Sequence, residues 1–235
     1  MQVKDVLESA LSPIANHARF RRIAGGFQTD VYGSDDHHYV VKIKNEPSGP
    51  MLSVLARARA QRQVADQFIA LLGPDHTISS DYVITGPSCD DAHLLVIQPF
   101  IAHARPLRSV DFDMLNHDER AVLAAQLQAI ICQALRSYRR YGYMPDLGGF
   151  PSNSPEDRRR LKALYLAPLH VWNFLRRQTL LRSHNLLLSA DDLRIILVDY
   201  DLVHRWKLVG WIYYTVRALL FARDWWLIER MKAKD

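Results

Sequence analysis

The sequence predicts an α+β fold, in which an antiparallel sheet formed by roughly the first hundred residues is followed by a mainly helical second half. Three observations support this prediction. The 235 residues are 49% hydrophobic and 23% charged, the balance of a globular chain that can bury a core without disulfides or metal. Before residue 100, short β-branched and aromatic segments alternate with Gly, Asp, Ser and Pro turns. After it, apolar residues recur mostly at helical spacing.

Five strands and one inserted helix are expected in the first half. The strands are predicted over residues 20–23, 31–32, 39–44, 81–85 and 93–98. Apolar side chains at helical spacing predict a helix over residues 51–72, and Gly73 and Pro74 end it.

The second half is expected to contain a long helix, a strand pair and terminal helices. The helix covers residues 118–141, begins at Asn116 or His117 and ends at Gly142. The strand pair covers residues 184–188 and 193–198, with a turn at Asp191 and Asp192. Terminal helices are predicted from about residue 206.

The net charge of +5 gives a pI of about 9.3 and is concentrated in one stretch. Residues 151–183 carry seven basic and two acidic side chains, so 7 minus 2 equals the whole excess. This stretch is either a solvated helix face or an arm that binds anions with arginine. Charge alone would support a nucleic-acid partner, and we do not expect one.

Cysteine usage and hydropathy favour a cytoplasmic protein. Cys89 and Cys132 are the only cysteines and form neither a disulfide framework nor a zinc site. The first twenty residues resemble no secretory signal. The most apolar window, residues 208–222, is interrupted by Arg217 and is shorter than the ~20 residues that span a bilayer. The aromatic C-terminus is expected to be core plus rim; the alternative is peripheral membrane contact.

Two features of the first half are suited to phosphate binding. Gly25 and Gly26 lie at a strand-to-strand turn, where the lack of Cβ atoms lets backbone N–H groups approach an oxyanion; the alternative is a plain hairpin turn. Lys42 follows in a β-branched strand and could point its ammonium group at a polyphosphate. Its alternative is a solvated lysine on an edge strand.

Together, the glycine turn and the Val-x-Lys strand resemble the nucleotide-covering hairpin of the protein-kinase-like superfamily. The end of the long helix, running from Leu135 to Leu147, resembles the entry to the kinase catalytic loop. The resemblance therefore implies that Asp146 is the catalytic aspartate; the alternative is a turn residue after Pro145.

The segment from His184 to Asp201 resembles the kinase hairpin that an Asn opens and an Asp closes. The resemblance implies that Asn185 and Asp199 hold Mg²⁺ and that Asp201 adds a further ligand. An ordinary hairpin with acidic ends is the alternative, and for Asp201 a solvated turn residue. The resemblance also implies a hinge at residues 98–101, where Gln98 and Phe100 would contact the adenine of ATP.

Several departures point to a compact branch of the superfamily, similar to RIO-like, lipopolysaccharide-core or aminoglycoside kinases. Asp146 lies 39 residues before Asn185, so the basic stretch would be inserted in the catalytic loop at about residues 148–183. The helix over residues 51–72 contains no glutamate to pair with Lys42; Asp66, Gln61 or Gln63 could replace it. Only 34 residues follow Asp201, too few for a full kinase C-lobe.

The resemblance implies a two-lobed kinase-like fold with an antiparallel-sheet N-lobe, residues 1–100, and a reduced helical C-lobe, residues 101–235. Its implied function is phosphoryl transfer from ATP, with Mg²⁺, to a hydroxyl of an unidentified acceptor, for which the basic stretch suggests an anionic compound. The alternative is a catalytically inactive pseudokinase that serves as a nucleotide-binding or partner-binding scaffold. A missing helix glutamate and a displaced catalytic aspartate favour this alternative.

Overall fold

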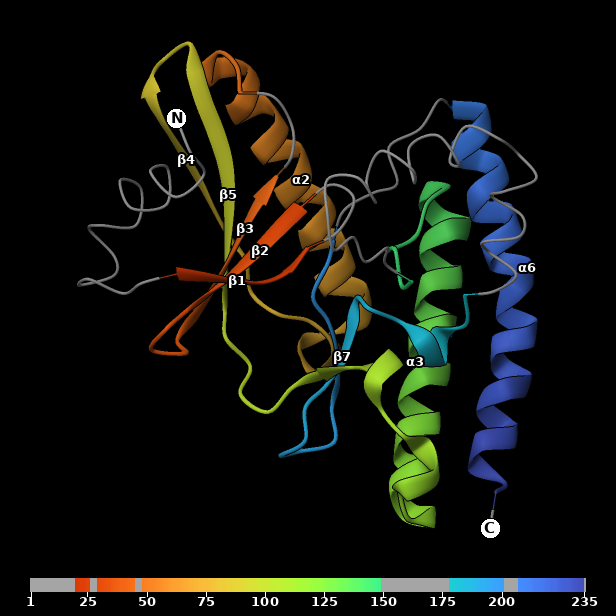
Figure 1. Cartoon of the computed structure of the whole chain (residues 1–235). Helices are drawn as coiled ribbons and strands as arrows, with labels where there is room; N and C mark the ends of the chain where they lie inside the picture. Colours follow the sequence, from red (N-terminus) through yellow and green to blue (C-terminus); the bar gives the residue numbers. More distant parts are fainter. Residues whose placement is uncertain (1–19, 26–28, 45–47, 149–177, 201–206, 235) are drawn as a thin grey trace. The chain divides into compact units, whose positions relative to one another are not determined.

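A computed structural model describes residues 20–25, 29–44, 48–148, 178–200 and 207–234. These residues divide into two compact units (Figure 1). The first contains the described residues of Met1–Gln63 and Ser79–Ala102, and the second those of Val64–Ile78, His103–Phe150 and Arg159–Asp235.

The first unit is built on a five-stranded antiparallel sheet with the order β1-β2-β3-β5-β4. The strands are β1 (Phe20–Gly25), β2 (Thr29–Ser34), β3 (Tyr39–Lys44), β4 (Asp81–Ser88) and β5 (Asp91–Pro99). Helix α2 (Met51–Leu72) connects β3 to β4, so β5 rather than β4 pairs with β3. The predicted bounds of β3 and α2 are confirmed, and the other strands extend beyond their predicted ends.

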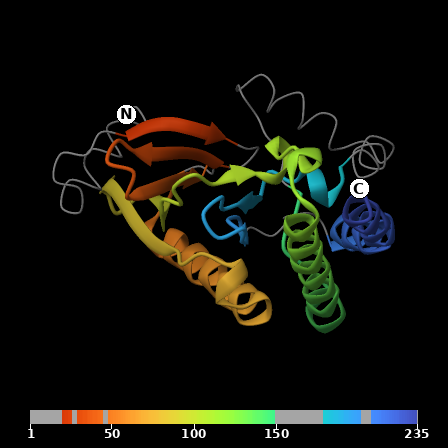
Figure 2. The ribbon, with the colours of Figure 1, turned by 90° about the horizontal axis from the view of Figure 1, so that it is seen from below.

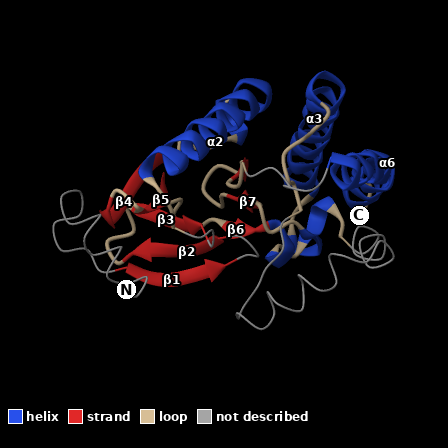
Figure 3. Ribbon diagram, turned by 90° about the horizontal axis from the view of Figure 1, so that it is seen from above, coloured by secondary structure: helices blue, strands red, loops and turns tan. Residues whose placement is uncertain are grey.

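The two faces of this sheet bury different clusters. On one face, Val41 and Ile43 of β3 pack with Leu95 and Ile97 of β5. On the other face, Val54 and Ala58 of α2 pack with Ala92 and Leu94 of β5. Figure 3 shows α2 lying along this side of the strands. Because side chains alternate along a strand, Lys42 lies on the face that α2 covers.

The second unit combines two long helices with a small antiparallel sheet of order β6-β7-β8. Its elements are β6 (Arg105–Pro106), α3 (His117–Tyr141), β7 (Leu186–Leu188), β8 (Ile195–Leu197) and α6 (Lys207–Lys232). Short 3-10 helices cover Pro74–His76, Leu107–Ser109, Phe112–Met114 and Leu180–Arg182. The predicted hairpin is therefore part of a three-stranded sheet, and the predicted terminal helices are one helix. The α+β class is confirmed.

The ends of α3 show why the sequence places it correctly. Asn116 and Glu119 form a reciprocal capping box, with both hydrogen bonds at 2.9 Å. At the other end, Gly142 takes a left-handed conformation with φ of 77° and donates its N–H to Tyr138 O. Glycine adopts this conformation easily because it has no Cβ atom, and the left-handed backbone turns the chain out of the helix here.

Helices α3 and α6 run side by side (Figures 1 and 2). Leu127 and Ile131 of α3 are buried, as are Tyr214 and Phe221 of α6. Helix α6 also exposes large apolar side chains: Trp211, Ile212, Leu219, Trp225 and Trp226. The described helices include none that is long and apolar enough to cross a membrane.

Candidate functional site

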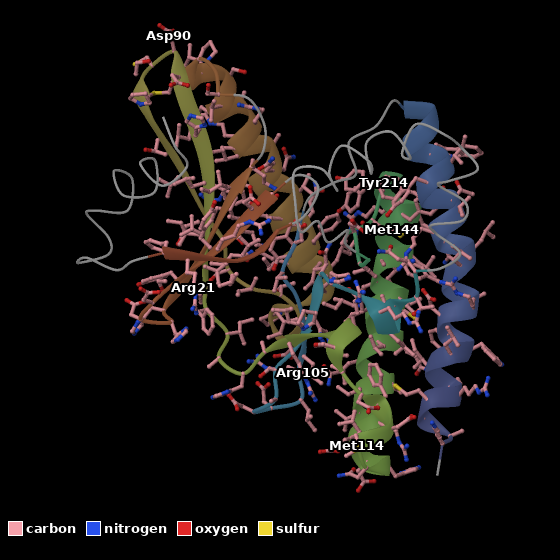
Figure 4. The ribbon with its side chains drawn as sticks, in the orientation of Figure 1. Arg21, Asp90, Arg105, Met114, Met144 and Tyr214 are labelled. Atoms are coloured by element: carbon pink, nitrogen blue, oxygen red, sulfur yellow. The ribbon has the colours of Figure 1, made fainter. Side chains whose placement is uncertain are left out.

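The structure brings Asp146 and Asn185 into direct contact. Asn185 donates from its side-chain Nδ2 to the backbone oxygen of Asp146 at 2.7 Å, although 39 residues separate them. Asp146 follows the end of α3, two residues after Met144, which Figure 4 labels. Met144 and Leu147 are each only 1% exposed and anchor the segment in the core. Its Oδ1 accepts a hydrogen bond from Gly148 N at 3.1 Å, which holds the carboxylate against its own backbone.

Ser183 connects the Asp146 segment to the Asn185 segment. This residue is fully buried, and its Oγ donates to Leu147 O at 2.5 Å. The same oxygen accepts from Asn185 N at 3.1 Å and from Leu186 N at 2.9 Å. One hydroxyl therefore satisfies three backbone groups and sets the relative position of the two segments.

Replacing Ser183 by Ala is expected to destabilise the second unit by about 2–3 kcal/mol, because three backbone groups lose the hydroxyl that they share. Chemical denaturation would measure this loss. A Ser109→Ala variant is the matched control, since the exposed Ser109 hydroxyl makes a single bond to Pro106 O at 2.8 Å. Equal effects of the two substitutions would contradict the proposed connecting role of Ser183.

Asn185 and Asp199 lie at the open end of the β7–β8 hairpin. Val198 donates its N–H to Asn185 O at 3.0 Å, one step beyond the last ladder pair, Leu186 with Leu197. Asp199 is the next residue and is half-buried. The pairing therefore places the two residues, which are 14 apart in sequence, on adjacent chain segments.

Tyr200 anchors the chain directly after Asp199. Its hydroxyl donates to Ile78 O at 2.7 Å and accepts from Ile78 N at 2.6 Å. Burial raises the pKa of Tyr200 to about 12, and the charge of Asp199 acts in the same direction. Tyr200 is therefore a neutral donor at pH 7, and it restrains the backbone that carries Asp199.

A neutral imidazole lies beside Asn185. Arg108 donates from Nη1 to His184 Nε2 at 2.8 Å, so the proton of the ring belongs on Nδ1. Burial lowers the pKa of His184, and the positive charge of Arg108 lowers it further. His184 therefore brings no positive charge to this part of the site at pH 7.

Two residues near Asp146 were not predicted from the sequence. Tyr213 of α6, which is 3% exposed, donates its hydroxyl to Asp146 Oδ1 at 3.4 Å. Gln178 lies close by: a Cβ atom built on Gly148 would be 2.5 Å from Gln178 Oε1 and 3.5 Å from Asp146 Oδ1. Tyr213 belongs to an aromatic run that sequence reasoning assigned to core and rim, so nothing in its pattern distinguished it.

In the first unit, Lys42 is a central and buried residue. Strand β3 lies between β2 and β5, and Lys42 is only 9% exposed. The alternative prediction, that Lys42 is a solvated lysine on an edge strand, is therefore wrong. Lys42 lies on the sheet face that α2 covers, and at a buried site of low polarity a charged group interacts more strongly with an anion.

Of the three residues predicted as candidates to pair with Lys42, Gln61 alone lies on the partly buried side of α2. Gln63 and Asp66 are exposed on α2. Gln61 follows Val54 and Ala58 on the buried stripe, and its Oε1 is buried with no hydrogen-bond partner in the described part of the chain. A buried amide oxygen needs a donor, and a lysine on the same sheet face can provide it.

The predicted phosphate turn and hinge are only partly available for binding. A Cβ atom at Gly25 would lie 2.1 Å from Arg22 Nη2, because the Arg22–Asp30 ion pair covers this position. Gln98 is 3% exposed and donates from Nε2 to Ser80 Oγ at 2.9 Å. The Phe100 N–H donates to His38 O at 2.8 Å, so this hinge N–H is already engaged within the unit.

Gly26, Asp201 and most of the basic stretch of residues 151–183 lie outside the described residues. Over the described ranges, no three His, Cys, Asp or Glu side chains cluster as metal ligands would. The predicted ligands in these ranges, Asn185 and Asp199, are an amide and a carboxylate. They are hard oxygen donors of the kind Mg²⁺ takes together with water and phosphate oxygens.

Comparison with known proteins gives structural neighbours only. No family model and no curated protein matches the chain. Solved structures that resemble it include an aminoglycoside phosphotransferase from Streptomyces rimosus, with 13% identity, a TM-score of 0.45, and coverage of 99% of this chain and 91% of the other. A spectinomycin phosphotransferase in complex with ADP and spectinomycin has 13% identity, a TM-score of 0.43 and coverages of 99% and 87%.

A third neighbour, a GDP complex of an aminoglycoside 2'-phosphotransferase mutant, has 13% identity, a TM-score of 0.42 and coverages of 98% and 90%. These neighbours belong to the protein-kinase-like superfamily, the group that the sequence resembles. At these TM-scores and this identity no function can be transferred, so the function has to be inferred from the residues of this chain.

Proposed function

We propose that the chain is an ATP- and Mg²⁺-dependent phosphotransferase that acts on a hydroxyl group of a small acceptor. The observation that carries the proposal is the 2.7 Å hydrogen bond from Asn185 Nδ2 to Asp146 O. It joins a residue to which the sequence resemblance gives metal binding with one to which it gives acceptor orientation. A plain hairpin with acidic ends would not need this contact.

Asp146 is proposed to orient the acceptor hydroxyl and to receive its proton as the new P–O bond forms and ADP leaves. The Gly148 N–H and the Tyr213 hydroxyl hold one of its carboxylate oxygens. A carboxylate fixed in this way loses little rotational freedom when an acceptor binds, and this lowers the cost of reaching the reactive geometry.

The residues present fit Mg²⁺ by their donor chemistry. Because the nitrogen of the Asn185 amide bonds Asp146 O, the amide oxygen is the atom of this side chain that would ligate the metal. Asp199 would add a carboxylate oxygen, and Asp201 is proposed as a further ligand. When bound, Mg²⁺ would neutralise charge on the phosphates of the nucleotide.

In the first unit, Lys42 is proposed to bind phosphate oxygens, with Gln61 accepting a hydrogen bond from its ammonium group. Gly25 and Gly26 are proposed to cover the phosphates, and residues 98–101 to contact the adenine. The excess of arginine in residues 151–183 favours an anionic acceptor, because a guanidinium group binds carboxylate and phosphate in a bidentate manner.

The nucleotide site can be tested by the thermal shift of the purified protein with ATP, with and without Mg²⁺. A ligand that binds only the folded state raises the melting temperature, so a rise that requires Mg²⁺ is expected. It should disappear in Asp199→Asn and persist in Asp191→Asn, a control at the exposed turn of the same hairpin. The lack of a shift at millimolar ATP in the unaltered protein would contradict the proposal.

Catalysis is tested by following labelled γ-phosphate from ATP to hydroxyl compounds that are neutral, cationic or anionic. Transfer to an anionic compound is the expected result. Mg²⁺-dependent binding of ATP without transfer to any compound, and without ADP formation, would instead favour the catalytically inactive scaffold. The feature that favours this second function, an inactive scaffold, is the absence of a glutamate from α2.

A further inference from the structure

The terminal helix α6 makes hydrogen bonds at two points, to Asp146 itself and to Gln178, which is distant from Asp146 in the sequence. The first is the Tyr213 hydroxyl, which donates to Asp146 Oδ1 at 3.4 Å. The second is Gln178, whose backbone oxygen accepts from Arg223 Nη2 at 2.5 Å and from Arg217 Nη1 at 3.3 Å. Both contacts come from the buried face of the helix, since Tyr213 and Arg217 are each 3% exposed.

The ring of Tyr213 is held in place from the side. It packs edge-on against Tyr214, with the ring centroids 5.3 Å apart and an interplanar angle of 79°. Tyr214 in turn lies against Tyr138 of α3, at 6.4 Å between centroids. Packing thus determines where the Tyr213 hydroxyl lies, so the hydroxyl is a fixed donor rather than a mobile one.

Gly148 explains how several groups fit around one carboxylate. Its N–H donates to Asp146 Oδ1 at 3.1 Å, the same oxygen that Tyr213 approaches. A side chain at residue 148 would require Gln178 to shift, because Gln178 Oε1 lies 2.5 Å from an ideal Cβ position. Asp146 Oδ1 therefore receives one donor from its own loop and one from α6.

We propose that Tyr213 is a positioning residue for Asp146, so that α6 completes the phosphotransfer site. The proposal rests on the function proposed above. Two donors on Oδ1 restrict rotation of the carboxylate that is proposed to orient the acceptor hydroxyl. Loss of the Tyr213 donor would remove one of the hydrogen bonds that hold the carboxylate, and productive orientations would become rarer.

The test compares Tyr213→Phe with Tyr138→Phe. The first variant keeps the buried ring and loses only the hydroxyl. The second removes a hydroxyl at the interface of the same two helices, where Tyr138 and Thr215 are hydrogen-bonded at 2.6 Å. This hydrogen bond does not involve Asp146. For Tyr213→Phe, kcat is expected to fall about tenfold with the KM for ATP unchanged, as a charged hydrogen bond lost in the transition state requires. For Tyr138→Phe both constants should remain as in the unaltered protein.

A second measurement does not depend on activity. In the protein without ligands, amide hydrogen exchange at Gly148 should become several-fold faster in Tyr213→Phe, because the carboxylate that accepts its N–H is held less firmly. Exchange at Gly142, whose N–H donates to Tyr138 O at 2.8 Å, is the internal reference and should not change.

Three results would overturn the proposal: unchanged kcat together with unchanged exchange at Gly148, an equal loss of kcat in Tyr138→Phe, or a loss of kcat accompanied by a higher KM for ATP. The second would assign the effect to helix docking and the third to the nucleotide site. If the unaltered protein transfers no phosphate, the proposed function fails separately. Exchange at Gly148 then decides whether Tyr213 holds Asp146.

Discussion

Asp146→Asn is expected to lower the rate of phosphoryl transfer by about 10²- to 10⁴-fold, the usual contribution of a positioned general base. The amide has almost the same shape as the carboxylate, so the backbone bond from Asn185 Nδ2 to Asp146 O at 2.7 Å should survive. Nucleotide affinity should therefore stay within about twofold. Transfer of labelled phosphate in single-turnover conditions measures the first quantity, and calorimetric titration with ATP and Mg²⁺ measures the second.

Asp111→Asn provides a matched control for Asp146→Asn. Its Oδ1 also accepts a hydrogen bond from the N–H two residues later, Asp113 N at 3.1 Å, but the side chain is exposed. This substitution repeats the local chemistry without altering the candidate site, and the transfer rate should not change. A rate for Asp146→Asn within threefold or so of the unaltered protein would contradict the role proposed for Asp146.

Asp224→Ala is expected to destabilise the protein by about 3–5 kcal/mol, the largest loss of stability among the substitutions considered. Asp224 is 1% exposed, and its carboxylate lies 2.8 Å from Arg223 Nη2 and 3.8 Å from Arg217 Nη2. Arg217 is 3% exposed, so truncation of Asp224 leaves a buried guanidinium without its counterion. Urea denaturation with linear extrapolation measures the loss.

The control for Asp224→Ala is an exposed ion pair on the same unit. Lys234 Nζ lies 2.6 Å from Asp113 Oδ2, and both side chains are more than half exposed, at 56% and 64%. Because solvent screens such a pair, Asp113→Ala should hardly change the free energy of unfolding. A double replacement, Arg217→Met with Asp224→Leu, should recover much of the lost stability, since apolar side chains can substitute for a buried pair. If Asp224→Ala and Asp113→Ala change the free energy of unfolding equally, the stability of α6 does not depend on its buried charges.

Elements with a strong local pattern could be predicted from the sequence. Strand β3 and helix α2 have the predicted bounds, since a β-branched run and a long apolar period each specify one backbone conformation. The start and end of α3 were predicted because Asn116 and Gly142 make local hydrogen bonds that the sequence encodes directly. Strand β6 was not predicted: its two residues, Arg105 and Pro106, form a strand only because β7 lies beside them.

The candidate site also has one part that could be predicted from the sequence and another that depends on tertiary contacts. Asp146, Asn185 and Asp199 were chosen from the resemblance of their segments to kinase motifs, and their mutual roles remain predictions. The 2.7 Å contact between Asn185 and Asp146 depends on the buried Ser183 hydroxyl, a long-range packing detail with no pattern in the sequence.

The sequence by itself determined the α+β class and the order of strands and helices apart from β6, because local hydrogen bonding and periodicity decide these. Its resemblance to kinase motifs suggested the residues for phosphate and metal chemistry. Tertiary structure alone decided that Lys42 is buried rather than solvated, that Gln61 rather than Asp66 is on the buried face of α2, and that Tyr213 reaches Asp146. The physical reason is that burial, and the pairing of polar groups distant along the chain, depend on which surfaces come together in space.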